Sequence, residues 1–345
     1  MADKMITSFD YGFSLQTTSI STAGAFGASD DGVLVGKCLV PLREMNPDFS
    51  PGQEWIRQRK ATGEPNWKIG TGYENVAGIK LPVATLPVDF NSYNLEAFLW
   101  GLYQTGAAED DTSPYETTFT VPDSPACEVW FSLLKRYSAA GADSVVIHGC
   151  IPRSITISGA EGDTLNGTVE FMGHTYSTAF TGSGAGLVFA EKAPLLWQNA
   201  TVEVDSNAVN MPDFNLTLTN NAFPQHFDSQ TPIKFLLGGG NGFEGSGDFF
   251  VPYGDTNEGT HAQMTDYLAG TAHTLEVYWG HDVDGAASWE AGDLACKFYI
   301  LKTGADDAEH NGEYGKRVSF DIVQSSTNEP ITILASNGED RAIPA

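Results

Sequence analysis

The residues of this sequence that could do chemistry are a glycine-rich turn, scattered histidines and several acidic pairs. Gly240-Asn-Gly-Phe-Glu-Gly245 matches the GxGxxG pattern that holds a pyrophosphate at the N-terminus of a helix. The segment that follows, Ser246-Gly-Asp-Phe-Phe-Val-Pro252, does not open a helix. We therefore predict a plain turn at these glycines, without a nucleotide site.

Metal-ligand spacings are also missing from the sequence. The seven histidines form no HExxH pattern, and the four cysteines form no CxxC pair. Asp282-Val-Asp-Gly285 begins like a calcium loop but lacks the third acidic ligand and the glycine position of that motif. We expect no metal and no cofactor. The cysteines are interpreted as small buried thiols, although an even number leaves two disulfides arithmetically possible: Cys38, Cys127, Cys150 and Cys296.

Catalytic patterns are equally absent. The sequence contains no GxSxG nucleophile elbow, and acidic pairs such as Asp110-Asp111 and Asp306-Asp307 lie in segments that read as solvated polar loops. We predict that the protein is not an enzyme. A pair of glycosidase carboxylates brought together by the fold is the enzymatic alternative that the sequence leaves open.

The charge of the chain restricts its partners. Its formal net charge is −26, whereas a surface that grips nucleic-acid phosphates needs an excess of Lys and Arg. We therefore expect no tight DNA binding, although an acidic surface would suit DNA that must slide past without sticking. No apolar run reaches the roughly 20 residues of a membrane-spanning helix, and Met1–Ser8 lacks the apolar core of a secretory signal. We expect neither a membrane nor export.

Strands dominate the expected architecture, and their pattern occurs twice. Apolar and polar residues alternate through Arg153–Ser158 and Thr168–Gly173, which predicts a half-buried strand pair. A similar pair is expected at Lys297–Gly304 and Gly315–Val323, joined by an acidic loop. We infer a duplicated unit of extended segments, a helix and paired strands, with two unrelated β-domains as the alternative.

One short helix is expected in each half. Apolar residues at helical spacing follow Asn91-Ser92, and Gly106 is a plausible stop. In the second half, Thr260 and Gln263 form a possible capping box, and Gly270 suits the left-handed residue that ends a helix. The fold class is therefore predicted as mainly β, with two tandem β-sandwich or barrel-like domains that each carry a short flanking α-helix. We expect the domains at 1–190, with an N-terminal arm, and at 191–345.

Several segments of the sequence resemble the tail tube proteins of long-tailed bacteriophages. They are Gln58–Gly70, Ile79–Val83, Leu95–Gly106 and Ile151–Asp163, within a likeness that spans most of residues 36 to 220. The resemblance implies a β-sandwich flanked by a helix, and a structural virion protein whose stacked rings form the hollow tube through which DNA leaves the head. Because the unit is duplicated, we predict rings of three chains that imitate six subunits, with a true hexamer as the alternative.

The resemblance also suggests which residues face the tube and its neighbours. An acidic lumen would repel DNA, and the expected lumen-facing acids are Asp163, Glu170 and Asp321. Contacts between rings are expected from extended or loop segments, with these candidates: Tyr73, Lys80, Glu109, Asp110 and Asp111. The implied partners are the chain itself, the tape measure protein and phage DNA in the lumen, the tail terminator, and baseplate or tip proteins. The implied location is the virion tail, assembled in the host cytoplasm.

Two other binding or assembly functions remain open. A carbohydrate-binding or adhesin-like β-sandwich would use aromatic side chains to stack on sugar rings, and this sequence offers Trp55, Trp67, Trp197, Tyr253, Trp279 and Trp289. A tail terminator or head-tail connector would share the fold class but form a single ring instead of a polymer.

Overall fold

The protein is described from a computed structural model. The described residues are 10–16, 38–39, 48–59, 73–104, 106–107, 115–119, 127, 130–136, 145–178, 193–226, 232, 234–238, 242–253, 260–280, 293–324 and 329–335. Within them the fold is mainly β with two α-helices, as the sequence predicted.

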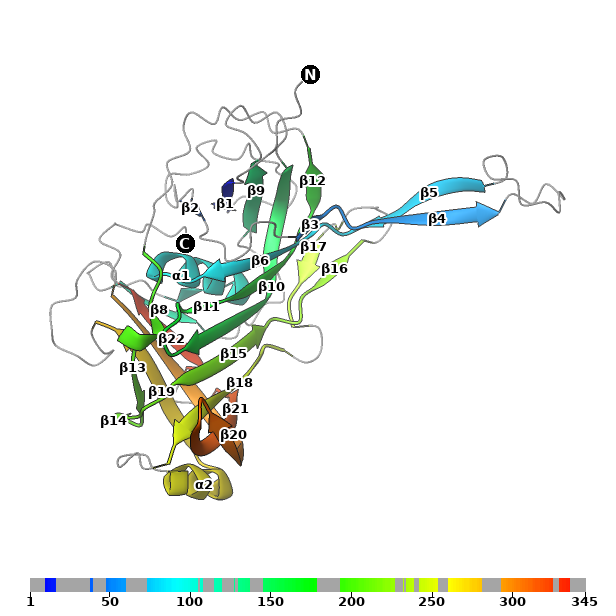
Figure 1. Ribbon diagram of the computed structural model, residues 1–345. Helices are drawn as coiled ribbons and strands as arrows, with labels where there is room; N and C mark the ends of the chain where they lie inside the picture. The colour runs from blue at the N-terminus through cyan, green and yellow to red at the C-terminus, as the bar shows by residue number, and fades with distance from the viewer. Residues whose placement is uncertain are drawn as a thin grey trace.

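The described part of the first half contains twelve strands and α1 (Figure 1). Their bounds are β1 (Asp10–Gln16), β2 (Cys38–Leu39), β3 (Asp48–Ser50), β4 (Gln53–Arg59), β5 (Tyr73–Lys80), β6 (Val83–Asp89), α1 (Ser92–Tyr103), β7 (Gly106–Ala107), β8 (Tyr115–Phe119), β9 (Trp130–Arg136), β10 (Val145–Ala160), β11 (Asn166–Met172) and β12 (Thr175–Ser177).

The described part of the second half contains ten strands, α2 and a short 3-10 helix, η2. Their bounds are η2 (Trp197–Asn199), β13 (Thr201–Val204), β14 (Asn207–Ala208), β15 (Asp213–Thr219), β16 (Phe223–Gln225), β17 (Lys234–Leu236), β18 (Glu244–Pro252), α2 (Thr260–Ala269), β19 (Ala272–Trp279), β20 (Leu294–His310), β21 (Glu313–Ile322) and β22 (Ile331–Ala335).

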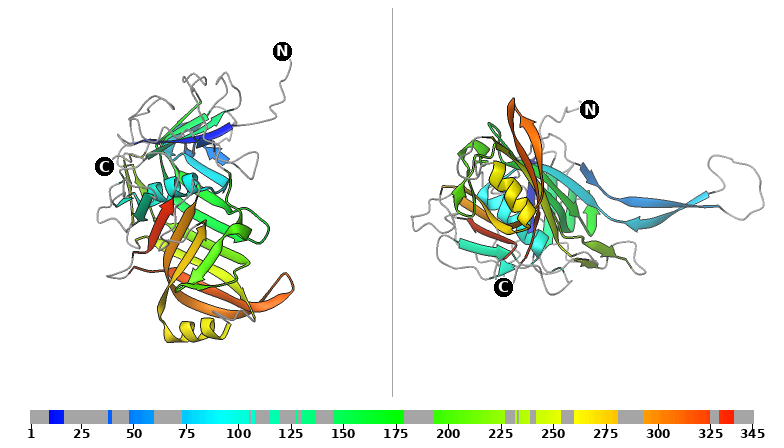
Figure 2. Two further views of the ribbon diagram at one scale, coloured as in Figure 1. Left: turned by 90° about the vertical axis from the view of Figure 1, so that its left-hand side faces the viewer. Right: turned by 90° about the horizontal axis from the view of Figure 1, so that it is seen from below.

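The long strand β10 belongs to two sheets in the first half. Its first part pairs with β9 and β12, and its second part pairs with β11, which continues to β6 and β3. The register slips by one residue between Pro152 and Ser154, so Arg153 forms a bulge where the strand passes from one sheet to the other. A β4–β5 hairpin leaves between β3 and β6 and projects far from the body (Figure 1; Figure 2, right).

The same order recurs in the second half. The long strand β20 pairs with β19 and β22 near its start and with β21 along its second part, and β21 continues to β18 and β15. The register again slips by one residue, between Lys302 and Gly304. A shorter hairpin, β16–β17, leaves between β15 and β18, and α2 connects β18 to β19 as α1 stands between β6 and β9. In this half the chain has no described counterpart of β7 and β8.

Two pairings between described strands join the halves. The second part of β10 pairs with β15, and β8 pairs with β22. Both pairings connect residues on opposite sides of the expected boundary at 190, and one apolar core contains side chains from both halves. The recurrence of strand order supports a duplicated unit, whereas the division into domains 1–190 and 191–345 stays a prediction.

Both helices occupy the predicted places, but their ends differ in chemistry. At the start of α1, Asn91 and Asn94 cap each other, because each backbone N–H donates to the other's Oδ1 at 2.8 Å. The residue that ends α1 is Gln104, which has a φ of 63° and donates its N–H to Trp100 O. The predicted stop at Gly106 is therefore wrong, and Gly106 lies in β7 instead. The predicted end of α2 is confirmed, with Gly270 at a φ of 63°.

Two expected loops are strands in the structure. The acidic segment after Gly304 continues β20 to His310, and the hairpin turns only at Asn311-Gly312. The sequence does not show the apolar alternation of a strand here, because few side chains of this segment enter the core. Within the polar segment 106–124, β7 and β8 are also strands.

Candidate functional site

One continuous sheet runs through both halves, in the order β3-β6-β11-β10-β15-β18-β21-β20. Burial alternates along its strands, as in β6 and β15, where every second residue is buried. One face packs on the core with side chains such as Leu86, Ile155 and Phe320. The opposite face, which we call the polar face, therefore points away from this core.

Ser, Thr and Asn residues cover the centre of the polar face. Ser158 of β10 donates to Asn215 Oδ1 of β15 at 2.9 Å, which connects the two halves through side chains. On the neighbouring pair of strands, Thr168 N donates to Thr156 Oγ1 at 2.9 Å. These short polar side chains satisfy one another across the strands and leave a hydrated surface without large protrusions.

An ion-pair cluster lies on the polar face of the second half. Arg317 of β21 contacts Asp248 of β18 and reaches Asp213 Oδ2 of β15 at 2.5 Å. His310 Nδ1 of β20 lies 3.7 Å from the same Asp213 oxygen. One guanidinium thus connects three adjacent strands and balances part of the acidic charge of this face.

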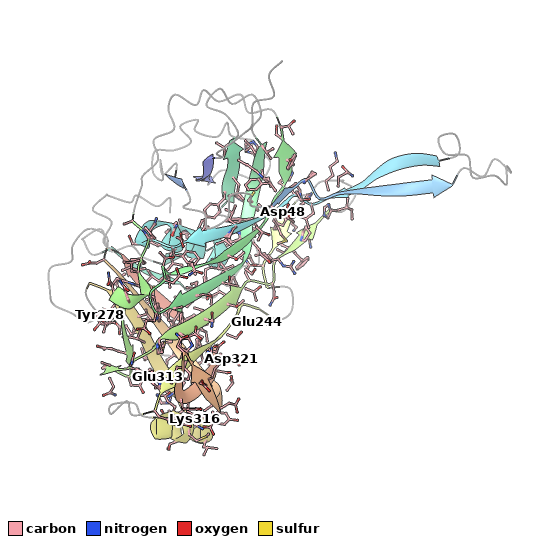
Figure 3. The ribbon with its side chains drawn as sticks, in the orientation of Figure 1. Asp48, Glu244, Tyr278, Glu313, Lys316 and Asp321 are labelled. Atoms are coloured by element: carbon pink, nitrogen blue, oxygen red, sulfur yellow. The ribbon has the colours of Figure 1, made fainter. Side chains whose placement is uncertain are left out.

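Five further acids of the polar face are exposed. Asp48, Glu170, Glu244, Asp306 and Asp321 all have exposed side chains, and they come from five different strands. Figure 3 shows Asp48, Glu244 and Asp321 one below the other along the sheet. The face therefore presents hydroxyl, amide and carboxylate groups to solvent, with negative charge distributed over its length.

The predicted lumen-facing acids have different positions. Glu170 of β11 and Asp321 of β21 lie on the polar face and are exposed. Asp163 lies in the turn after β10, where its Oδ1 accepts the N–H of Thr164 at 2.8 Å, so it stands at the end of the face and closes a turn. That these acids line a lumen stays a prediction.

The predicted inter-ring residues are only partly described. Tyr73 and Lys80 are the first and last residues of β5, in the projecting β4–β5 hairpin. Glu109, Asp110 and Asp111 fall outside the described residues.

Sequence reasoning missed several acids of the polar face. Asp48 and Glu244 lie outside the two strand pairs whose alternation predicts a half-buried sheet, and Asp306 lies in a segment whose sequence predicts a loop. Apolar and polar residues also alternate through Phe214–Leu218 of β15, which is a further sequence signal of this sheet.

The described residues offer no group of three or more His, Cys, Asp or Glu side chains that could hold a metal. Cys127, Cys150 and Cys296 are free thiols in the structure, and burial raises the pKa of both Cys127 and Cys296 to about 12. The side chain of Cys38 is outside the described set. Cys150 and Cys296 are buried, as predicted, whereas Cys127 is only partly buried.

Two of the aromatic residues proposed for sugar stacking are buried in the core. Trp197 stacks on Phe214 with ring centroids 5.5 Å apart and meets Trp279 edge to face, and both tryptophans are buried. Tyr253 is exposed, yet its hydroxyl donates to Asp307 Oδ1 at 2.5 Å. These three residues do not form an aromatic platform.

Comparison with known proteins identifies the family. No curated protein matches this sequence. No helix in the described part of the chain is long and apolar enough to cross a membrane. The family model described as phage tail tube protein matches residues 13–320, which is most of the chain and includes both halves. That family is a structural one, whose members assemble into the tube of the phage tail. This chain therefore belongs to the phage tail tube protein family, and its place is in the tail of the virion.

Proposed function

We propose that this protein polymerises as stacked rings into the tail tube and that its polar face lines the bore through which DNA is ejected into the host. The observation that carries the proposal is the eight-strand sheet with a core on one side and a Ser, Thr, Asn and acid surface on the other. Joining such sheets between chains would also remove exposed strand edges, which otherwise promote aggregation.

The charges of the polar face suit a conduit for DNA. Duplex DNA carries about one negative charge per 1.7 Å of its length, so exposed acids such as Glu170 and Asp321 repel it. Physiological salt screens the repulsion beyond about 8 Å, which confines it to the layer next to the wall. DNA and the tape measure protein would therefore occupy the lumen without tight binding.

The recurring strand order supports a ring of three chains. Each chain supplies the unit twice, so three chains present six similar units around one axis. A ring of six chains is the alternative. Assembly would take place in the host cytoplasm, and the finished tube would meet the tail terminator at one end and baseplate or tip proteins at the other.

The β4–β5 hairpin is the segment best placed to contact the next ring. It extends far beyond the body in both views that show it (Figure 1; Figure 2, right), and it includes the predicted stacking residues Tyr73 and Lys80. A contact made by such an arm would stabilise the stack only when a second ring is present. Glu109, Asp110 and Asp111 remain proposed for the same role.

Electron microscopy of the purified chain tests the proposal. We expect hollow tubes by negative stain and a soluble species that light scattering weighs at three times the 37.0 kDa chain, against six times for a hexamer. A single ring that never extends would favour a terminator or connector. Persistent monomers, even with virion extract, would overturn the proposal.

The lining role of the polar face has its own test. A cysteine replacing Glu170 should react with a bulky maleimide-polyethylene glycol in the soluble chain and be protected in tubes. A cysteine replacing Glu329, which is exposed next to β22, serves as the matched control. Equal labelling of the Glu170→Cys variant in tubes and in the soluble chain would show that this face is not the lumen.

A further inference from the structure

The junction between the halves shows how two units of this chain join. Ser154–Ala160 of β10 runs antiparallel to Asp213–Thr219 of β15, with Ser158 opposite Asn215. The apolar sides of these strands enter the core, where Ile157 stands opposite Leu216. This pairing makes one sheet from two halves.

β3 holds the position in the first half that β15 holds in the second. Each precedes a hairpin and pairs with the strand that comes before the helix, which is β6 for β3 and β18 for β15. The registers also agree: Asp48 lies in the row of Glu170 and Ser154, directly after the first bulge. Asn215 lies in the row of Ser319 and Gly304, directly after the second bulge. Asp48 and Asn215 are therefore equivalent positions.

β20 offers the edge that β10 uses for β15. Its residues Gly304–His310 follow a bulge as Ser154–Ala160 do, and they pair with β21 on one side. Among the described residues, no strand pairs with the other edge of Gly304–His310, and none pairs with the outer edge of β3. These two edges are complementary, because their equivalents in β10 and β15 pair with each other within the chain.

The end of α2 repeats this contrast. At the end of α1, in the first half, Asn220 of the second half donates its side-chain amide to Leu102 O of α1 and to Pro152 O of β10. At the corresponding end of α2, Tyr267 is 37% and Leu268 is 75% exposed. Lys302 of β20 binds Asp266 of α2 at 2.8 Å, so this apolar end lies beside the bulge where the unpaired edge begins.

We propose that the β20 edge of one copy pairs antiparallel with β3 of the next copy, and that the chain following β3 covers the end of α2. The register places Asp48 opposite Ala308. Within the chain, Asn215 is the equivalent of Asp48, and it stands opposite Ser158, which is four residues beyond Ser154. The residue four positions beyond Gly304, the equivalent of Ser154, is Ala308. The inference rests on the proposed ring and specifies its subunit contact. The contact is head to tail, and the proposed ring requires that the rotation between successive copies close after a whole number of chains.

The composition of this contact differs from that of the internal junction. Asp306, Asp307 and Glu309 on β20 meet a strand that carries Asp48, whereas the internal junction pairs Ile and Leu side chains. Edge charges keep unassembled strands from pairing indiscriminately. Because added salt screens like charges, ring formation should be faster at high ionic strength than at low ionic strength.

Disulfide trapping tests the register. In the Asp48→Cys, Ala308→Cys double variant, oxidised rings should yield a ladder of covalently linked chains on non-reducing gels, because directly opposed residues have Cβ atoms about 4.5–5.5 Å apart. The ladder should end at the number of chains in the ring. Either single variant should give no ladder above dimer.

Two further pairs control the geometry. The Ser158→Cys, Asn215→Cys double variant has the same register inside one chain. It should form a disulfide within that chain, so its band on the non-reducing gel stays at the position of a single chain. Asp48→Cys with Asp307→Cys places the thiols on opposite faces of the sheet and should not produce the ladder. Tubes that form normally without any Asp48–Ala308 linkage, while the internal control links, would overturn this contact and leave the tube function intact. Failure of the wild-type chain to form rings would instead overturn the proposed function.

The α2 contact is tested by Leu268→Asp. Since Leu268 is exposed in the single chain, the variant should fold as a monomer with unchanged circular dichroism, and its ring formation should fall at least tenfold. Leu196→Asp, at an exposed leucine outside α2, β3 and β20, is the matched control and should assemble. Normal assembly of the Leu268→Asp variant would show that α2 is not covered by a neighbour.

Discussion

The two helices occupy equivalent places in the two halves, yet their surroundings are opposite. α1 is buried along its described residues, with Phe98 meeting Phe131 and Phe171 in the core and Tyr103 stacked on Phe243 of the second half. α2 lies at the far end of the molecule (Figure 1; Figure 2, left) and exposes Tyr267 and Leu268. The difference follows from what comes after each unit: the second half covers α1, whereas no described segment of the chain covers the end of α2.

This contrast shows how a duplicated unit divides its contacts. One junction, between β10 and β15, is made within the chain from apolar side chains and buried hydrogen bonds. The equivalent edges at β20 and β3 are charged and unpaired among the described residues. The same strand order thus forms one permanent junction within the chain and leaves an equivalent pair of edges for assembly.

The largest expected effect is a difference in the free energy of unfolding between equivalent substitutions in the two helices. Phe98→Ala should lower the free energy of unfolding by about 3–5 kcal/mol, because it removes a fully buried ring and leaves a cavity. Leu268→Ala on α2 should change the same quantity of the monomer by at most about 0.5 kcal/mol. Urea denaturation of both variants measures the difference. Comparable losses would mean that α2 is already packed in the single chain.

The next effect concerns the hydrogen bonds of the internal junction. Asn220 is fully buried, and its side chain contacts Leu102 O at 3.1 Å, Pro152 O at 2.8 Å and Ala222 N at 3.1 Å. Asn220→Ala leaves these backbone groups without that partner and should cost about 2–3 kcal/mol. Asn207→Ala, at an exposed asparagine, is the control. A loss below 1 kcal/mol in thermal or urea unfolding would argue that the junction does not depend on this side chain.

The polar face provides a smaller comparison. Arg317 of β21 is the register equivalent of Thr168 of β11, so an ion-pair cluster in one half replaces a threonine hydrogen bond in the other. Arg317→Thr should cost about 1–2 kcal/mol, since Asp213 and Asp248 lose their shared cation while keeping partial access to water. Thr168→Ala should cost less. The loss in the Arg317 variant should shrink in high salt, and a salt-independent loss would contradict an ionic cause.

Most of the predictable fold followed from the alternation of apolar and polar residues along the strands. It located the β10–β11 and β20–β21 strand pairs because their apolar residues enter a core, and helical spacing located α1 and α2. It failed for Asp306–His310, because a strand at an unpaired edge has little core contact and therefore no strong pattern.

The candidate site was only partly visible for a related reason. Glu170 and Asp321 were predicted, whereas Asp48 and Glu244 reach the same face through pairings between distant strands. Pairing of β10 with β15 depends on tertiary packing, and a single sequence contains no local signal for it. The equivalence of β3 with β15 likewise became apparent only from the registers, since β3 has three residues and β15 has seven.

The smallest expected effect is a pH dependence confined to the first half. His148 is buried in β10 with its Nδ1 3.0 Å from Ser132 Oγ, and burial, together with the nearby His174, lowers the pKa of its imidazole. β10 slips by one residue against β9 between Ile147 and Cys150, where His148 lies, whereas β20 pairs with β19 without a slip and carries no histidine there.

Because the folded chain binds this proton less readily than the unfolded chain does, the stability linked to His148 is complete above the unfolded pKa of about 6.5 and declines as pH falls through it. We expect the urea midpoint of the wild-type monomer to fall between pH 7.5 and pH 5.5. The fall should be smaller for His148→Asn, which keeps a hydrogen-bonding group near Ser132 but no longer titrates. Equal falls in the two proteins would assign the acid sensitivity to other groups, and the two halves would then respond to pH alike at this position.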